Sequence, residues 1–317
     1  EVLDRLVAPV AGGIHSAAPR LLAPDAVAPG LLERLRDAGS LVGAAERQRA
    51  DAPAGAVVSA VEGGMFRLVE ALRDRIEELG GDVATEHLVR AVRPTRSGWE
   101  VVVTGRLRPS EPWLPGRSDG VATTLTTPRI VVALDGREAL ELLRPIPGLD
   151  LGDWRLPDGA DLIQVTLAVD DARLDAAPRG SGCLVVPSLG GPVRAKALTH
   201  YSAKWPWART SSGQHVLRVS YGRAGTPTPE PTTGEALRDA STLLGVDLDP
   251  LSVRGAMTVH FANALPPHTP DHRARVSELQ RAIARVPGLA VTGAWVAGSG
   301  LAGAVPHAEA TVERVLA

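Results

Sequence analysis

The glycines near the C-terminus form the pattern in this sequence that is best suited to ligand chemistry. The run Gly298-Ser299-Gly300-Leu301-Ala302-Gly303 follows the short apolar segment Leu289–Thr292 and opens a helical pattern that continues to Leu316. Glycines between a strand and a helix let a phosphate approach the partly positive N–H groups of the helix N-terminus. A complete dinucleotide site also needs a second strand and an acidic residue about 20 positions later. Residues 304–317 are too few for both, so the turn either binds nothing or faces part of a cofactor held elsewhere.

Two histidines, His268 and His272, stand four residues apart, which is the spacing of two metal ligands on one face of a helix. Three prolines around them keep the first histidine in a loop, and no glutamate accompanies the pair. We therefore expect no metal site here, and we interpret His272 as a structural residue at the start of a helix. A third histidine, His307, is expected at the surface of the last helix.

The single cysteine and the serines do not indicate a nucleophile. Cys183 excludes an internal disulfide and a metal site with several cysteines. Because it precedes the apolar run Leu184–Val186, we expect it to be a small buried residue of a strand. Ser181, Ser188 and Ser202 lack the G-x-S-x-G context that exposes the nucleophile of many hydrolases. A hydrolase is therefore not supported.

Helical and strand-like patterns alternate along the chain. Helices are expected at Glu1–Ala11, around Leu31–Leu35, from Gly63 to Gly80, at Glu235–Leu244, at His272–Val286 and from the glycine turn to Leu316. Strands are expected at Leu88–Val92, Trp99–Thr104, Arg129–Leu134 and Leu289–Thr292, and an antiparallel sheet at Leu162–Val169, Gly182–Val186, Ala195–Ser202 and His215–Tyr221. Because the two patterns interleave throughout, the predicted fold class is α/β or mixed α+β.

The composition excludes several classes of function. Hydrophobic residues make up 44% of the 317 residues and charged residues 22%, values typical of a globular protein with a sizeable core. With 34 Lys and Arg against 36 Asp and Glu, the formal net charge is -2, so no nucleic-acid partner is expected. Only Lys196 and Lys204 of the 34 basic residues are lysine. This bias is typical of GC-rich coding, so the number of arginines does not indicate a site.

The sequence predicts a cytoplasmic protein without a transmembrane segment. No apolar run approaches the roughly 18 residues that span a bilayer, and no signal peptide is visible. A peripheral membrane contact stays open, and the oligomeric state is not indicated. The chain starts with Glu1 rather than Met, inside an amphipathic helical pattern. We therefore expect it to be a fragment of a longer protein.

Five motifs in the same order resemble the protoporphyrinogen and coproporphyrinogen oxidases. They are Val10-Ala11-Gly12-Gly13-Ile14; Gly63-Gly64-Met65 with a helix that ends at Gly80-Gly81; Lys204-Trp205-Pro206; Leu217–Arg223; and the C-terminal run of Ala264–His268, His272, Gly288-Leu289 and the glycine turn up to Leu301. The resemblance covers nearly the whole chain. The N-terminal G-x-G-x-x-G unit that holds the FAD pyrophosphate in this family does not occur before these motifs.

The resemblance implies the fold of the amine oxidase superfamily, with an FAD-binding domain, here incomplete, and an inserted substrate domain of antiparallel sheet and helices. On this basis residues 1–55 and 137–283 form the helical and sheet parts of the substrate domain. Residues 56–136 and 284–317 form the middle and C-terminal segments of the FAD-binding domain.

The resemblance also implies which residues contact FAD and substrate. The cofactor-binding residues carried over are Val89, Phe261, Gly293, Trp295, Gly298, Ser299, Gly300 and Leu301. Phe261 stands where the family usually has Trp. The N-terminus of the last helix is expected to stabilise negative charge on the reduced flavin. Lys204, beside Trp205, is the candidate partner of a substrate propionate, and the favoured alternative is a surface lysine beside an interface tryptophan.

The implied activity is oxidation of coproporphyrinogen III or protoporphyrinogen IX to the porphyrin in haem biosynthesis, with FAD as cofactor and O2 as acceptor. The small-molecule partner would be a tetrapyrrole, and no residue that acts as a catalytic base is visible. A different flavin-dependent amine oxidase or desaturase is the first alternative. A non-catalytic, truncated homologue is the second, because without its pyrophosphate-binding segment this chain is expected to bind FAD poorly and to be inactive on its own.

Overall fold

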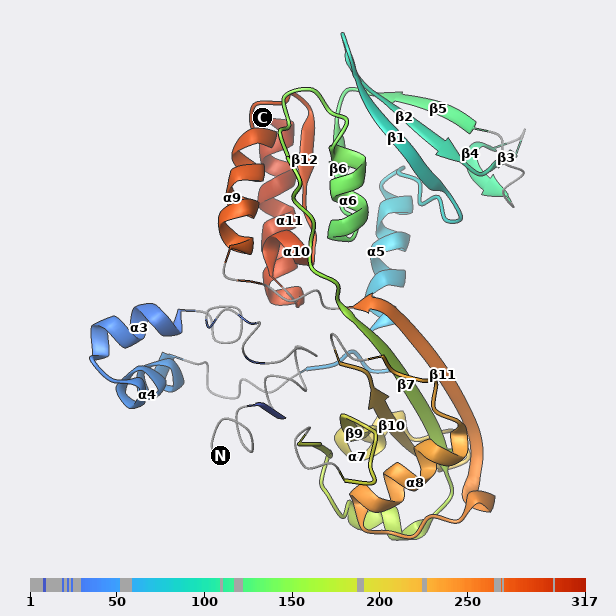
Figure 1. Ribbon diagram of the computed structural model, residues 1–317. Coiled ribbons are helices and arrows are strands. Elements are labelled where there is room, and N and C mark those ends of the chain that lie inside the picture. Colours follow the sequence, from blue (N-terminus) through green and yellow to red (C-terminus); the bar gives the residue numbers. More distant parts are fainter. Residues whose placement is uncertain are drawn as a thin grey trace. The chain divides into compact units, whose positions relative to one another are not determined.

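Figure 1 shows the computed structural model of the chain, which describes residues 8–9, 19, 22, 24, 30–51, 59–108, 111–116, 122–186, 191–223, 227–264, 269, 271–298 and 300–317. The chain divides into two compact units. Unit 1 comprises residues 1–65 and 157–270, and unit 2 comprises residues 66–156 and 271–317. The first family-like motif, residues 10–14, and most of the expected helix Glu1–Ala11 lie outside the described residues.

The centre of unit 2 is a pair of short parallel strands with helices packed against it. Strands β6 (Ile130–Val132) and β12 (Leu289–Val291) pair in parallel, and α9 (His272–Ile283) and α11 (Leu301–Leu316) both contact β12. Parallel strands are usually buried by helices, which agrees with three consecutive buried residues in β12. The helix α6 (Gly136–Leu143) buries Ala139, Leu140 and Leu143 in the same core. Helices α6 and α9 therefore pack in this unit, although residues 137–283 were expected in the substrate domain.

A three-stranded antiparallel sheet extends unit 2. Its order is β1 (Leu88–Thr95), β2 (Gly98–Thr104) and β5 (Ala122–Thr127), and a hairpin of β3 (Arg106–Arg108) and β4 (Glu111–Gly116) follows β2. Trp99 joins this sheet to the core, because its buried indole donates from Nε1 to the Pro287 carbonyl at 3.2 Å. Strands β1, β2, β6 and β12 confirm four expected strands, whereas β3, β4 and β5 were not expected.

The helix α5 (Phe66–Glu78) precedes this sheet and ends where the sequence predicts, before Gly80 with φ 80°. None of its residues is buried. The apolar stripe formed by Phe66, Val69, Leu72 and Ile76 is exposed by 44% or more at each residue. This helix is therefore amphipathic, with its apolar side uncovered.

Unit 1 is built on a five-stranded antiparallel sheet with the order β11-β7-β10-β9-β8. The strands are β7 (Ala160–Val169), β8 (Gly182–Leu184), β9 (Ala197–His200), β10 (His215–Tyr221) and β11 (Val253–Ala264). In β7 and β10 every second residue is buried, which places one face of the sheet against a core shared with α8 (Thr233–Leu244). Four of these strands confirm the expected sheet, and β11 was not expected.

The ends of α8 show how local sequence positions an element. The Thr232 hydroxyl accepts from the Glu235 backbone N–H at 3.2 Å, and the Glu235 carboxylate accepts from the Thr232 N–H at 2.8 Å. This capping box starts the helix two residues before the expected position. Gly245, with φ 70°, ends it. Further short helices of unit 1 are α3 (Leu31–Ala38), α4 (Leu41–Asp51), α7 (Tyr201–Lys204), and the 3-10 helices η3 (Ala172–Ala176), η5 (Pro206–Ala208) and η6 (Pro250–Ser252).

Across the described part of the chain, the structure contains no helix that is both long and apolar enough to cross a bilayer.

Candidate functional site

The glycine turn of unit 2 connects β12 to α11 through the one-turn helix α10 (Ala294–Ala297). Gly293, Gly298 and Gly300 have φ values of 129°, 95° and 100°, a region that residues with a side chain rarely adopt. A Cβ atom on Gly298 or Gly300 would meet no atom within 4 Å. Glycine is therefore required at these positions by the backbone conformation, and the backbone beside them is open to a ligand. Ser299 lies outside the described residues.

The N-terminus of α11 lies directly after this turn. The Gly300 carbonyl accepts from the Ala304 N–H at 3.1 Å, so the helix starts at Leu301, whose side chain is 52% exposed. The aligned peptide dipoles of a helix of 16 residues give this end a partial positive charge. An anionic or electron-rich group could approach it across the glycines. The predicted helix is confirmed, and Pro306 is tolerated inside it at the sixth residue.

Trp295 is the buried anchor of the turn. It is 6% exposed, and its ring lies 6.1 Å from that of Trp154, between centroids. Gly136 makes room for it, since a Cβ there would lie 2.7 Å from Cγ of Trp295. The indole Nε1 is buried and has no hydrogen-bond partner among the described residues. A buried donor without an acceptor costs free energy, so a bound group with an acceptor atom would fit here.

His272 holds the backbone of α10 in place. Its Nε2 donates to the Trp295 carbonyl at 2.7 Å, and the imidazole is buried. This confirms a structural role at the start of α9, although His268 lies outside the described residues. The expectation that His307 lies at the surface is wrong. It is half-buried, 2.9 Å from Thr292 Oγ1 and 3.0 Å from Gln280 Nε2, because α11 turns this residue toward β12 and α9.

The other predicted cofactor residues fall in both units. Val89 lies at a bulge in β1, is half-buried, and packs against the same core as Trp295. Phe261 lies in β11 of unit 1 and is 47% exposed. Unit 2 therefore brings together Val89, Trp295 and the glycine turn. The contact of all these residues with FAD stays a prediction.

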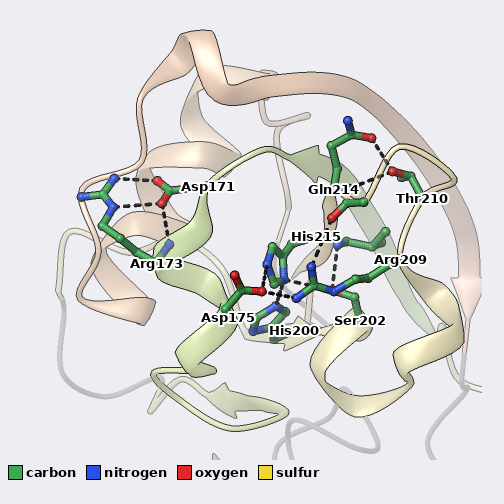
Figure 2. A network of polar contacts seen from close by, with 11 residues as sticks. Asp171, Arg173, Asp175, His200, Ser202, Arg209, Thr210, Gln214 and His215 are labelled. Atoms are coloured by element: carbon green, nitrogen blue, oxygen red, sulfur yellow. Dashed lines mark hydrogen bonds and ion pairs between the residues drawn. The ribbon is translucent and has the colours of Figure 1, made fainter.

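Unit 1 contains a polar network that the sequence did not indicate, formed by Asp175, His200, Ser202, Arg209 and His215 (Figure 2). Nε2 of His200 lies 3.0 Å from Nδ1 of His215, and Nε2 of His215 lies 3.3 Å from Oδ1 of Asp175. Arg209 donates to the same carboxylate oxygen. The neighbouring strands β9 and β10 place the two histidines side by side, since His200 pairs with Leu217, two residues from His215.

The directions of these hydrogen bonds follow from the carboxylate. A carboxylate only accepts, so His215 carries its proton on Nε2 and its Nδ1 accepts from Nε2 of His200. Nδ1 of His200 is then a buried acceptor, and it has no partner among the described residues. Burial and the neighbouring His215 lower the pKa of His200 to about 4, and burial lowers the pKa of His215 as well. Both imidazoles are therefore neutral at pH 7.

Two lysines of unit 1 differ in environment. Lys204 is exposed at the end of α7, and its Nζ lies 5.5 Å from the ring centroid of Trp205. Lys196 is 6% exposed, and burial together with Arg223 lowers its pKa to about 8. Cys183 in β8 packs at the edge of the sheet core, and burial raises the pKa of its thiol. Cys183 therefore lies in a strand as expected, but it is half-buried rather than buried.

Comparisons with known proteins identify several that are similar to this chain along most of its length. A curated coproporphyrinogen III oxidase from Staphylococcus aureus (strain NCTC 8325 / PS 47) is 22% identical over 333 residues, which are 100% of this chain and 66% of the relative. The solved structure of a "Putative protoporphyrinogen oxidase" from Exiguobacterium sp. 255-15 matches with a TM-score of 0.76 at 20% identity, over 99% of this chain and 63% of that protein. The chain therefore has the fold of this solved structure. The resemblance and the mixed α/β class are thereby confirmed.

Two further solved structures have a similar fold. Reduced UDP-galactopyranose mutase matches with a TM-score of 0.59 at 10% identity, over 93% of this chain and 60% of that protein. An oxidoreductase from Methanosarcina mazei matches with a TM-score of 0.56 at 14% identity, over 98% of this chain and 64% of that protein. No family profile matches the chain. The chain spans about two thirds of the length of these relatives.

Proposed function

We propose that this protein oxidises a porphyrinogen to the porphyrin in haem biosynthesis, with FAD as cofactor and O2 as electron acceptor. The observation that carries the proposal is the glycine turn. It combines an open backbone at Gly298 and Gly300, the N-terminus of α11 and the buried, unsatisfied donor of Trp295. The similarity to a curated coproporphyrinogen III oxidase supports the substrate class.

In this proposal, cofactor binding and substrate binding belong to different units. Unit 2 contains the parallel strands, the glycine turn and Val89, so we assign FAD binding to it. Unit 1 contains the large antiparallel sheet and Lys204, so we assign substrate binding to it.

FAD, when bound, would accept two electrons at a time from the porphyrinogen, so formation of the porphyrin would take successive rounds, each followed by reoxidation with O2 to hydrogen peroxide. The residues of this chain position and stabilise it. The N-terminal N–H groups of α11 favour negative charge on the reduced ring, and Gly293 lets the backbone come close. The indole N–H of Trp295 offers one hydrogen bond from the core side. No catalytic base is assigned.

Coproporphyrinogen III is the favoured substrate over protoporphyrinogen IX. The name of the curated relative supports this choice. We also propose that the protein works in the cytoplasm, with O2 and the tetrapyrrole as its small-molecule partners.

The test uses the product of the complete reading frame that contains this sequence. After purification, the visible spectrum gives the flavin content, and porphyrin fluorescence follows the oxidation of coproporphyrinogen III or protoporphyrinogen IX. We expect a yellow protein that produces porphyrin and hydrogen peroxide, with the higher kcat/KM for coproporphyrinogen III. A protein that holds FAD but oxidises neither porphyrinogen would contradict the proposal and favour an amine oxidase or a desaturase.

A matched pair of variants tests the role of the turn. Gly300→Val places a side chain on the proposed ligand face, whereas Gly148→Val introduces a side chain at another glycine of unit 2 with φ 86° and open space around it. Both variants carry a similar backbone strain, of roughly 1–3 kcal/mol. We expect Gly300→Val alone to lose flavin. Equal flavin content in the two variants would show that the turn does not contact the cofactor.

A further inference from the structure

Arg218 of unit 1 is a half-buried cation whose Nε lacks a hydrogen-bond partner in the described part of the chain. Arg218 lies in β10 between the buried residues Leu217 and Val219, so its side chain leaves the sheet on the face opposite to the α8 core. Its guanidinium carbon lies 3.8 Å from the ring centroid of Tyr201. Its Nε is buried and has no hydrogen-bond partner among the described residues.

Three other arginines of unit 1 each have a carboxylate partner, and no such partner is found for Arg218 in the described part of the chain. Arg194 pairs with Glu235 at 2.9 Å, and Arg254 pairs with Asp170 at 3.1 Å. Arg209 pairs with Asp175. Each of these guanidinium groups therefore has a carboxylate partner. Arg218 has lost part of its hydration, and the Tyr201 ring supplies a cation–π contact but no hydrogen-bond acceptor, so an external anion could still bind to the guanidinium.

The residues next to Arg218 include three aromatic rings in pairwise contact. The Tyr201 ring meets Trp207 edge-on, with centroids 5.9 Å apart and an angle of 88° between the planes. Trp207 and Trp205 lie nearly parallel, at 25° and 6.4 Å. Nζ of Lys204 lies 5.5 Å from the Trp205 centroid. We call this set, from Arg218 through Tyr201, Trp207 and Trp205 to Lys204, the aromatic row.

The aromatic row contains several of the few aromatic residues of the chain. The chain has only six Trp, two Tyr and two Phe, and three of these ten side chains stand here within seven positions of sequence. All three are half-buried rather than fully buried, so part of each ring stays accessible. Because a cation stands at each end of the row, the surface combines flat apolar contacts with two positions for negative charge.

We propose that the aromatic row binds the substrate's carboxylates and one edge of its tetrapyrrole ring, with a carboxylate on Arg218 and a second one on Lys204. Arg218 is the principal contact, because its planar guanidinium can bind a carboxylate through two parallel hydrogen bonds while it is stacked on Tyr201. This inference rests on the proposed function, which makes the ligand a tetrapyrrole that carries several propionates. It extends the predicted role of Lys204 to a site in which Arg218, unexpected from the sequence, is dominant.

The test measures equilibrium binding of coproporphyrin III, the tetracarboxylate product, by the change in its fluorescence on titration with the complete protein. We expect Arg218→Met to weaken binding by about tenfold to a hundredfold, which corresponds to the loss of a charge-assisted hydrogen bond. Arg218→Lys should recover part of the loss, because it keeps the charge but not the planar fork. Lys204→Met, at an exposed position, should weaken binding less.

Two controls separate recognition from folding. Arg254→Met removes an arginine of the same sheet that is already paired with Asp170, and it should leave binding unchanged. The tetramethyl ester of coproporphyrin, which has no carboxylate, should bind equally to wild type and Arg218→Met. Unchanged affinity of Arg218→Met for the acid, or an equal loss for acid and ester, would overturn the proposal.

The same variants distinguish this inference from the proposed function. If binding depends on Arg218 but the flavin-loaded protein oxidises no porphyrinogen, the proposed activity fails and the binding site stands. If wild type and Arg218→Met oxidise coproporphyrinogen III with the same KM, the activity stands and the role of Arg218 fails. We expect KM to rise in Arg218→Met while kcat changes little, because the propionate carboxylates are not the groups that are oxidised.

Discussion

Nε2 of His272 donates a hydrogen bond to the backbone carbonyl of Trp295 at 2.7 Å, and this bond joins the first residue of α9 to the helix that precedes the glycine turn. The imidazole is buried, and its ring lies 6.4 Å from that of Trp154, which also contacts Trp295. The position of the proposed FAD-contacting turn therefore depends on a residue 23 positions earlier in the sequence.

His272→Leu should lower the affinity for FAD. The substitution keeps an apolar side chain in the core but leaves the Trp295 carbonyl without its donor, which costs about 1–3 kcal/mol. We expect purified His272→Leu to contain less flavin than wild type, measured as the ratio of visible to ultraviolet absorption. His260→Leu, at an exposed histidine of unit 1, is the control. If His272→Leu retained full flavin content, the bond would not position the turn.

Gly136→Ala should destabilise unit 2. The new Cβ would lie 2.7 Å from Cγ of Trp295 and still nearer to Leu156 Cδ1, so the indole or the leucine must move. Overpacking of this kind costs about 1–3 kcal/mol. Urea unfolding followed by tryptophan fluorescence measures the change. Gly234→Ala, in the first turn of α8 with no atom nearer than 3.7 Å, should be neutral or slightly stabilising. A neutral Gly136→Ala would show that the core around Trp295 is loosely packed.

Acid should destabilise unit 1 through His200. Its pKa is about 4 in the folded protein and 6.5 when unperturbed. Between these values the unfolded chain binds more protons, so the free energy of unfolding rises with pH from 4 to 6.5 and then levels off. The contribution is up to about 3 kcal/mol above pH 6.5. The lowered pKa of His215 acts in the same direction, whereas Asp175, with a pKa below 3.8, acts only at lower pH.

The pH effect is measured by urea unfolding at several pH values between 4.5 and 7.5, a range set by the pKa shift of His200. His200→Gln should have a flatter profile than wild type, because it removes one titrating group from the network. His260→Gln, at an exposed histidine beside Glu230, should follow wild type. Parallel profiles for wild type and His200→Gln would mean that His200 does not titrate between the folded and unfolded states as described.

Tyr221→Phe should destabilise the same sheet. The buried Tyr221 hydroxyl donates to Oδ2 of Asp239 at 3.0 Å, and the Ala195 N–H donates to the same oxygen at 3.0 Å. Burial, followed by the charge of Asp239, raises the pKa of Tyr221, so the phenol stays protonated and keeps donating. Loss of one donor to a buried carboxylate costs about 1–3 kcal/mol. Thermal unfolding should show a lower Tm, and an unchanged Tm would indicate that water replaces the hydroxyl.

The period of the apolar residues was enough to predict most of the sheet in unit 1. His215–Tyr221 alternates strictly between buried and half-buried residues, and the observed β10 has the same bounds. In contrast, β11 was missed because Arg254, Gly255 and the exposed Met257 break its alternation on an edge strand. The short helix α6 and the strand β5 were also missed, since each is too short for its pattern to stand out.

The candidate site was only partly accessible from the sequence. The glycine turn was found because strand, glycines and helix are contiguous, so spacing alone indicates their arrangement. The histidine network and the aromatic row depend on the register of β9 and β10, which pairs Arg218 with Thr199 and places Tyr201 beside it. Such contacts between strands are not visible until the register is known. The one available signal for the histidine network was that β9 and β10 each contain a histidine, His200 and His215, which could meet if the two strands paired.

The measurement that tests the central claim most directly is anaerobic mixing of the flavin-loaded, complete protein with coproporphyrinogen III. We expect the absorption of oxidised flavin to disappear on mixing, and we expect admission of O2 to restore the flavin, release hydrogen peroxide and, through further two-electron rounds, develop the porphyrin absorption. If the flavin stays oxidised while dithionite still reduces it, the protein does not oxidise coproporphyrinogen III, and the proposed function is contradicted.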